Sequence, residues 1–88
     1  MLSLKDLTET ANRVVGTRQT TKAVQEGRAK KVFIAEDAED RITGPLMELC
    51  NAKGIEIVKV KSMKELGSAC GIDVGAASAA VIETAVES

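Results

Sequence analysis

The stretch 31-KVFIA-35, a lysine followed by four apolar residues in a row, is the clearest indication of the fold. A short continuous apolar run that contains β-branched residues is typical of a strand buried on both faces. The acidic segment 36–40 follows at once, so the run ends in a loop. A strand that is covered on both faces belongs inside a sheet, and the sequence therefore predicts helices on either side of it.

Helical and extended patterns alternate on both sides of this run. The capping box Ser62-Met63-Lys64-Glu65 opens a helix that Gly71 closes, and Pro45 suits the first turn of the preceding helix. The expected helices lie near residues 3–11, 17–27, 45–54 and 62–71, and the expected strands at 13–16, 31–35, 55–60 and 78–82.

Strands that alternate with helices favour right-handed crossovers and a parallel sheet. We therefore expect an α/β fold, a single three-layer α/β/α sandwich with a small mixed, mainly parallel sheet. The length of 88 residues suits one core, so residues 1–88 form one domain, with a short frayed tail from about residue 84. Hydrophobic residues at 44% and charged residues at 28% place the chain among globular proteins.

The composition excludes several classes of function. The chain has no histidine and a single aromatic residue, Phe33, so neither an imidazole-assisted nucleophile nor base recognition by stacked aromatic rings is expected. It has no Walker-type loop and no dinucleotide-binding glycine pattern, and we expect no metal or other cofactor. Since there is no signal peptide and no apolar run of membrane length, we expect a cytoplasmic protein without a membrane partner.

The two cysteines are interpreted as buried free thiols. In a chain without histidine, Cys50 and Cys70 fit neither a disulfide framework nor a zinc site. Each falls on the apolar face of a predicted helix, Cys50 beside Leu46 and Cys70 beside Met63 and Leu66.

A polar segment, 16-GTRQTTK-22, opens the helix expected at 17–27. With Thr17 as the cap, Arg18, Gln19 and Lys22 lie on one side of the first turns, since residues three and four apart are neighbours on a helix. Two cations and an amide then stand beside the free N–H groups at the positive end of the helix dipole. This arrangement suits an anionic or acceptor-rich ligand, such as a guanine edge or a phosphate. On spacing alone, a surface helix with solvated charges is the better interpretation.

A second unusual segment, 72-IDVGAA-77, joins the last helix to the last strand. It places Ile72 and Val74 in a connection, where exposed apolar side chains usually meet a partner. The alternative is that both side chains pack beneath the helix ends. The glycines at 67, 71 and 75 are interpreted as a close-packing residue, a helix stop and a loop residue, rather than as a phosphate cradle.

The acidic segment 36–40 supports a competing interpretation. Carboxylates after a strand hold magnesium in receiver-like α/β domains, so a small ligand-binding or phosphoacceptor domain is an alternative. A solvated loop with capping residues for the next helix is favoured, because no acidic pair ends another strand.

Three blocks in register, GTRQTTKAVQEGRAKKVFIAEDA, CNAKGIEI and LGSACGIDVGAASAAV, resemble the L-seven-Ae family of kink-turn-binding ribosomal proteins. The likeness runs from about Val14 to Ile82 and is greatest to the short bacterial members of the YbxF type. It implies an α/β/α sandwich that binds kink-turn RNA, a sharply bent helix with consecutive sheared G·A pairs. It also implies a monomeric, non-enzymatic RNA-binding protein, with the ribosome as a further partner and no DNA partner.

The resemblance also implies roles for particular residues. Gly16 and Thr17 would shape the helix entry, and Arg18, Gln19 and Lys22 would face guanines and nearby phosphates. The loop residues Ile72, Asp73, Val74 and Gly75 would pack against nucleotides flipped out at the bend. Many archaeal and eukaryal members carry Asn-Glu where this chain has Arg18-Gln19, so we expect weaker discrimination among bases and more electrostatic binding.

Overall fold

A computed structural model of the chain describes residues 12–82. The order of elements is β1 (Arg13–Val15), α2 (Thr17–Gln25), β2 (Ala29–Ala35), α3 (Asp40–Lys53), β3 (Glu56–Val60), α4 (Met63–Ala69) and β4 (Ser78–Ile82). The helix predicted near residues 3–11 and the tail predicted from about residue 84 lie outside the described residues. None of the helices in residues 12–82 is long and apolar enough to cross a membrane.

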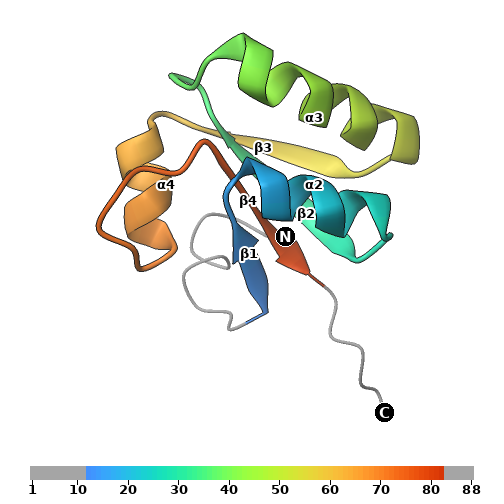
Figure 1. The fold of residues 1–88 in the computed structure, drawn as a ribbon, viewed down its shortest axis with the longest axis horizontal. Coiled ribbons are helices and arrows are strands. Elements are labelled where there is room, and N and C mark those ends of the chain that lie inside the picture. Colours follow the sequence, from blue (N-terminus) through green and yellow to red (C-terminus); the bar gives the residue numbers. More distant parts are fainter. Residues whose placement is uncertain (1–11, 83–88) are drawn as a thin grey trace.

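The four described strands form one mixed sheet in the order β1-β4-β2-β3 (Figure 1). The mixed α/β class is confirmed, but the expectation of a mainly parallel sheet is wrong. Only β2 and β3 are parallel, whereas β4 runs antiparallel to both β1 and β2. The reason lies in α4, a helix of seven residues whose following loop stays near the helix start, where the Ala76 N–H donates to the Met63 carbonyl. Because the chain does not return to the end of the sheet where β2 and β3 begin, β4 begins at the end where they finish and runs in the opposite direction.

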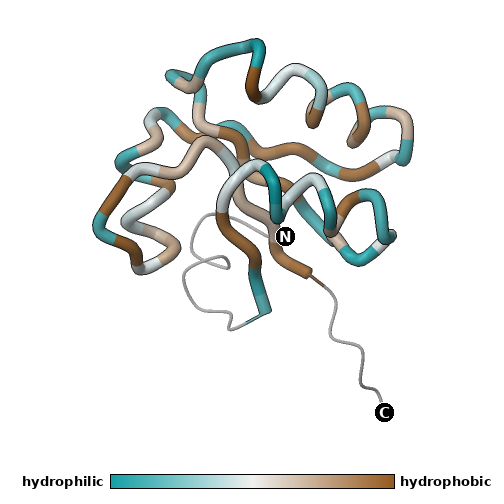
Figure 2. Tube along the Cα trace, viewed as in Figure 1, coloured by the Kyte–Doolittle hydropathy of each residue, from teal (hydrophilic) through white to brown (hydrophobic). Residues whose placement is uncertain are grey.

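Helices cover both faces of the sheet, as predicted. Helices α2 and α3 lie on one face, and α4 lies on the other (Figure 1). The strand residues at the centre of the fold are hydrophobic (Figure 2), and β2 serves both faces, with Val32 and Ile34 toward α2 and α3 and Phe33 toward α4. The predicted central strand is therefore confirmed, and it begins two residues earlier than expected.

Helix α3 begins at Asp40, five residues before the predicted start. Glu39 precedes it in an extended conformation, and the acidic Asp40 stands in the first turn, where the dipole favours a negative charge. Pro45 is tolerated inside the helix because only one hydrogen bond is lost, the one to the Arg41 carbonyl. Arg41 and Pro45 are both exposed, so water can reach that carbonyl. The predicted end is confirmed, since Gly54 has the left-handed φ of 70°.

Helix α4 and the cysteines largely match the prediction. The capping box is confirmed on one side, as the Glu65 N–H donates to the Ser62 hydroxyl at 3.0 Å. Leu66 and Cys70 are buried, whereas Met63, predicted on the same buried face, is 37% exposed. Cys50 and Cys70 are free and buried, and burial raises the pKa of both thiols.

Candidate functional site

The first turns of α2 present the polar side chains that the sequence predicts. Arg18, Gln19 and Lys22 are all exposed, while Ala23 and Val24 face the core. We call these three exposed side chains the polar face of α2. The first turn has no acidic residue and no side-chain cap, so its N–H groups and the positive end of the dipole are open to a ligand.

Thr17 does not cap α2, contrary to the prediction. The N-cap is Gly16, whose φ of 96° and ψ of 149° belong to a region that only glycine adopts without strain. Thr17 is the first helical residue, and its hydroxyl is hydrogen-bonded to the hydroxyl of Ser78 at 2.9 Å. The Gly16 N–H donates to the Ser78 carbonyl at 2.8 Å. The start of α2 is therefore bound to the start of β4.

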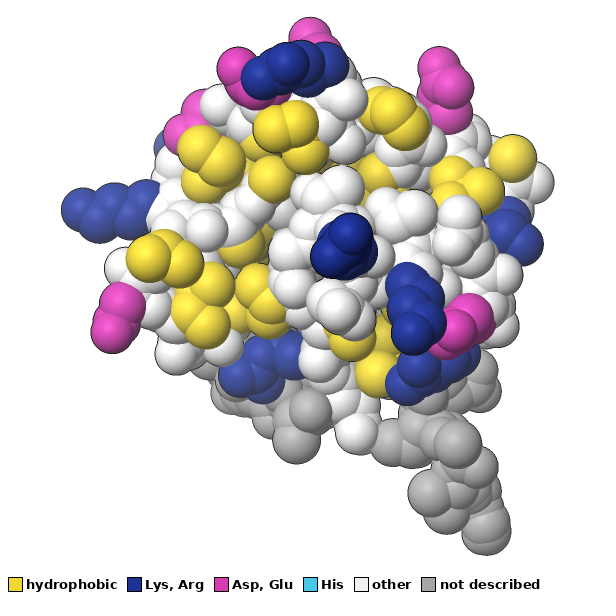
Figure 3. Space-filling view, viewed as in Figure 1, with side chains coloured by type: hydrophobic (Ala, Val, Ile, Leu, Met, Phe, Trp, Pro, Cys, Tyr) yellow, Lys and Arg dark blue, Asp and Glu magenta, His cyan; other side chains and the backbone are white. Residues whose placement is uncertain are grey.

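Residues 72–75, which we call the apolar loop, lie between α4 and β4, two residues before the strand begins. Val74 is 69% exposed and Ile72 is 36% exposed, so the alternative in which Val74 packs beneath a helix end is wrong. Met63, exposed on α4, adds to this surface. Figure 3 shows hydrophobic side chains gathered over α4 and its following loop, and Lys and Arg side chains over α2.

The apolar loop is held against α4 by a close backbone contact. A Cβ atom added at Gly67 would collide with the Val74 carbonyl oxygen, so Gly67 is the close-packing glycine that the sequence predicts. Gly71 has a φ of 79°, which suits the predicted helix stop. Arg13 on β1 donates to the Cys70 carbonyl at 2.9 Å and supports the same turn.

We call the polar face of α2 and the apolar loop together the composite surface. They are far apart in the sequence, and two hydrogen bonds attach Gly16 and Thr17, at the start of α2, to Ser78 at the start of β4, the strand that follows the loop. This surface offers two cations, an amide, free helix N–H groups and apolar side chains. It suits a ligand that has negative charges, acceptor-rich edges and apolar faces. Sequence reasoning missed Ser78, because a serine within a predicted strand gives no signal of its partner.

The acidic segment 36–40 has a structural role. Asp37 Oδ1 accepts a hydrogen bond from the Met63 N–H at 2.7 Å, so Asp37 caps α4, not the next helix as predicted. Glu39 pairs with Arg41 at 3.0 Å on the surface. Within residues 12–82 there is no group of three His, Cys, Asp or Glu side chains that could hold a metal ion.

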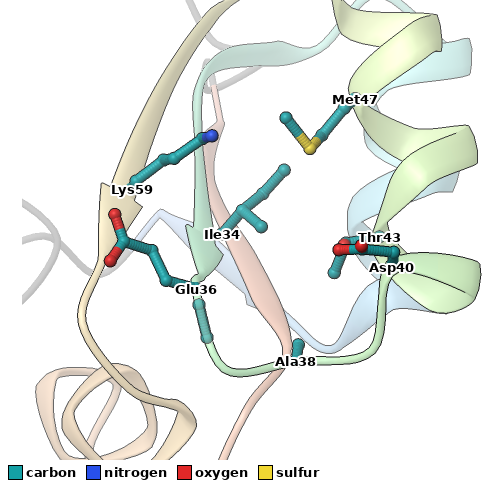
Figure 4. A pocket seen from close by; sticks show the side chains of 8 residues that line it. Ile34, Glu36, Ala38, Asp40, Thr43, Met47 and Lys59 are labelled. Atoms are coloured by element: carbon teal, nitrogen blue, oxygen red, sulfur yellow. The ribbon is translucent and has the colours of Figure 1, made fainter.

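A cavity of about 270 Å³ lies between α3 and the ends of β2 and β3, and Figure 4 shows Lys59 reaching toward Ile34 and Met47. None of its lining residues belongs to the polar face of α2 or to the apolar loop. They are Ile34, Ala35, Glu36, Ala38, Asp40, Thr43, Met47 and Lys59. The sequence gives no signal for this cavity.

The fold is that of a small mixed α/β protein, with exposed cations on α2 and exposed apolar side chains on α4 and the loop that follows it. The family model for "Ribosomal protein L7Ae/L30e/S12e/Gadd45 family" matches residues 2–88, and the chain belongs to this family. The resemblance found in the sequence is thereby confirmed.

Named relatives agree with this assignment. An RNA-binding protein of Caldanaerobacter subterraneus subsp. tengcongensis is 54% identical over 68 residues, which cover 77% of this chain and 83% of the relative. The large ribosomal subunit protein eL8 of Halobacterium salinarum is 46% identical over 81 residues, which cover 91% of this chain and 68% of that protein. Among solved structures, a Giardia lamblia 15.5kD RNA binding protein superposes with a TM-score of 0.82 at 29% identity, covering 93% of this chain and 69% of the other.

Proposed function

We propose that this protein is a non-enzymatic, cytoplasmic RNA-binding protein that acts as a monomer and stabilises kink-turn motifs in ribosomal or regulatory RNA. Two of the relatives are named as RNA-binding proteins, and the third is a protein of the large ribosomal subunit. The observation that carries the finer proposal is the junction at Ser78, which attaches the start of α2 to β4, the strand that follows the apolar loop.

The polar face of α2 enters the widened major groove at the sheared G·A pairs. Lys22 and Arg18 donate to guanine acceptors or phosphates, and Gln19 both donates and accepts on a base edge. Gly16 and Thr17 set the angle at which the helix enters. The open N–H groups of the first turn supply a further place for a phosphate.

The apolar loop contacts the nucleotides that the bend pushes out of the helix. Val74 and Ile72 exclude water from a base face, although they cannot stack as aromatic rings do. Asp73 and Gly75 complete the loop. Because Gly75 has no Cβ atom, the loop backbone can lie close to Met63 of α4.

The proposed mechanism is selection of one RNA shape. Free RNA exchanges between extended and kinked forms, and a protein that fits only the kinked form shifts the population toward it. Arg18-Gln19 favours electrostatic attraction over base discrimination, because a neutral amide accepts from a guanine edge without the assistance of a negative charge.

The competing interpretation, a ligand-binding or phosphoacceptor domain that uses segment 36–40, is not favoured. Asp37 is occupied in capping α4, and the described residues hold no metal-binding cluster.

Titration of the protein into two RNA hairpins tests the proposal. One carries a kink-turn, and in the other the sheared G·A pairs are replaced by Watson–Crick pairs. A fluorophore pair on the two arms reports bending as well as binding. We expect tighter binding to the first RNA, together with bending. Equal affinity for both RNAs contradicts kink-turn recognition, and a carboxylate-dependent magnesium response without RNA supports the competing interpretation.

A further inference from the structure

Asp37 fixes the beginning of α4 to the loop that follows β2. Its Oδ1 accepts from the N–H of Met63, the first residue of α4, and the Ser62 hydroxyl accepts from Glu65. These bonds satisfy two of the four N–H groups that a helix start leaves without internal partners. The carboxylate is also attracted by the positive end of the helix dipole.

The same turn of α4 carries the apolar loop. The Met63 carbonyl accepts from the Ala76 N–H at 3.0 Å, and a Cβ atom at Gly75 would lie 3.0 Å from the Met63 Cβ. Further along the helix, the Gly67 carbonyl accepts from the Ile72 N–H at 3.1 Å. Both ends of the loop are thus attached to α4, so a shift of its first turn moves the loop.

We propose that Asp37 is a positioning residue for RNA recognition, which sets the place of the apolar loop through Met63 without contacting the RNA. This inference rests on the proposed function. The inference predicts that removal of the Asp37 carboxylate weakens RNA binding. Electrostatics alone predicts the opposite, because removal of a negative charge strengthens the attraction to RNA phosphates.

Three variants separate these effects. Asp37→Ala removes the acceptor, Asp37→Asn keeps an acceptor oxygen without the charge, and Glu36→Gln removes one charge from the neighbouring exposed position. We expect Asp37→Ala to bind the kink-turn hairpin more weakly, by up to about fivefold, the limit set if RNA binding has to restore the whole stabilisation that an N-terminal capping side chain gives a helix. Asp37→Asn should restore most of this loss, and Glu36→Gln should bind as well as the unchanged protein or more tightly.

Two readouts distinguish positioning from a general loss of stability. Hydrogen exchange at the Ile72 and Ala76 amides should quicken in Asp37→Ala, while exchange at Phe33 in the core should not. In double-mutant cycles, Asp37→Ala and Val74→Ser should be non-additive in RNA affinity, because both act through the loop. Asp37→Ala and Lys22→Ala should be additive.

The failures are distinguishable. If the unchanged protein does not prefer the kink-turn hairpin, the proposed function is wrong and the inference is lost with it. If the preference exists but Asp37→Ala retains full affinity, or if its effect adds to that of Val74→Ser, the positioning role is overturned. Should Asp37→Ala not fold, Asp37→Ser enters the same cycles, and its additivity with Val74→Ser would overturn the inference equally.

Discussion

The hydroxyl groups of Thr17 and Ser78 lie 2.9 Å apart, although 61 positions separate them in the chain. Ser78 is fully buried, and its carbonyl also accepts from the Gly16 N–H. The buried Ser78 hydroxyl is satisfied by the half-buried Thr17 hydroxyl, and without Thr17 it is left without a partner. This contact attaches the start of α2 to β4.

Thr17→Val, which keeps the side-chain shape, should lower the free energy of unfolding by about 1–3 kcal/mol, because the Ser78 hydroxyl stays buried without a partner. The double variant with Ser78→Ala should recover much of this loss. Denaturation by urea measures both. Full additivity of the two single changes would show that the hydroxyls do not interact.

Lys22→Ala should cost about 1–3 kcal/mol of affinity for a kink-turn RNA if the lysine contacts a guanine edge. Its stability should change by less than about 0.5 kcal/mol, because the side chain is exposed. Lys53→Ala, at the far end of α3, is the matched control for loss of one positive charge. Equal effects of the two changes would reduce Lys22 to a general electrostatic role.

Arg18 and Gln19 are expected to act differently. Gln19→Ala should reduce the preference for sheared G·A pairs over Watson–Crick pairs, since it removes a base-edge partner. Arg18→Ala should weaken binding to all RNAs and lower the salt-dependence slope by about one unit if it contacts phosphate. Titrations at several salt concentrations measure both quantities. The same uniform loss from both variants would mean that neither residue distinguishes bases.

Val74→Ser should weaken RNA binding while thermal stability changes little, because Val74 is 69% exposed in the free protein. Burial of a side chain of this size against RNA is worth up to roughly 1.5–3 kcal/mol. The control is Ile42→Ser on α3, which is 42% exposed and lies outside the composite surface. Unchanged affinity of Val74→Ser would show that the apolar loop does not contact the RNA through this side chain.

Gly16→Ala should destabilise the protein by about 1–3 kcal/mol, through backbone strain alone. Nothing lies within 4 Å of an added Cβ atom at Gly16, but its φ of 96° disfavours any other residue. Gly44→Ala inside α3, where φ is not positive, is the comparison without this strain, although the ring of Pro45 crowds the added Cβ and removes the usual gain of a glycine-to-alanine change. Thermal denaturation compares the two, and a neutral Gly16→Ala would mean that this conformation is not required.

Features that depend on local periodicity could be predicted from the sequence. The apolar run 31–35, the spacing of Arg18 and Lys22 on one helix side, and the capping box at Ser62 all follow from residues within a few positions of one another. The structure confirms the central strand, the exposure of the polar face and the helix cap.

Which distant segments of the chain contact one another became clear only from the folded structure. The antiparallel direction of β4, the partner of Thr17, the role of Asp37 and the exposure of Val74 could not be predicted. These features depend on contacts between residues that are distant in the sequence. Met63 and Ala76 are 13 positions apart, and Thr17 and Ser78 are 61 positions apart. Local propensity carries no information on such pairs, because they form only when packing of the whole chain brings them together.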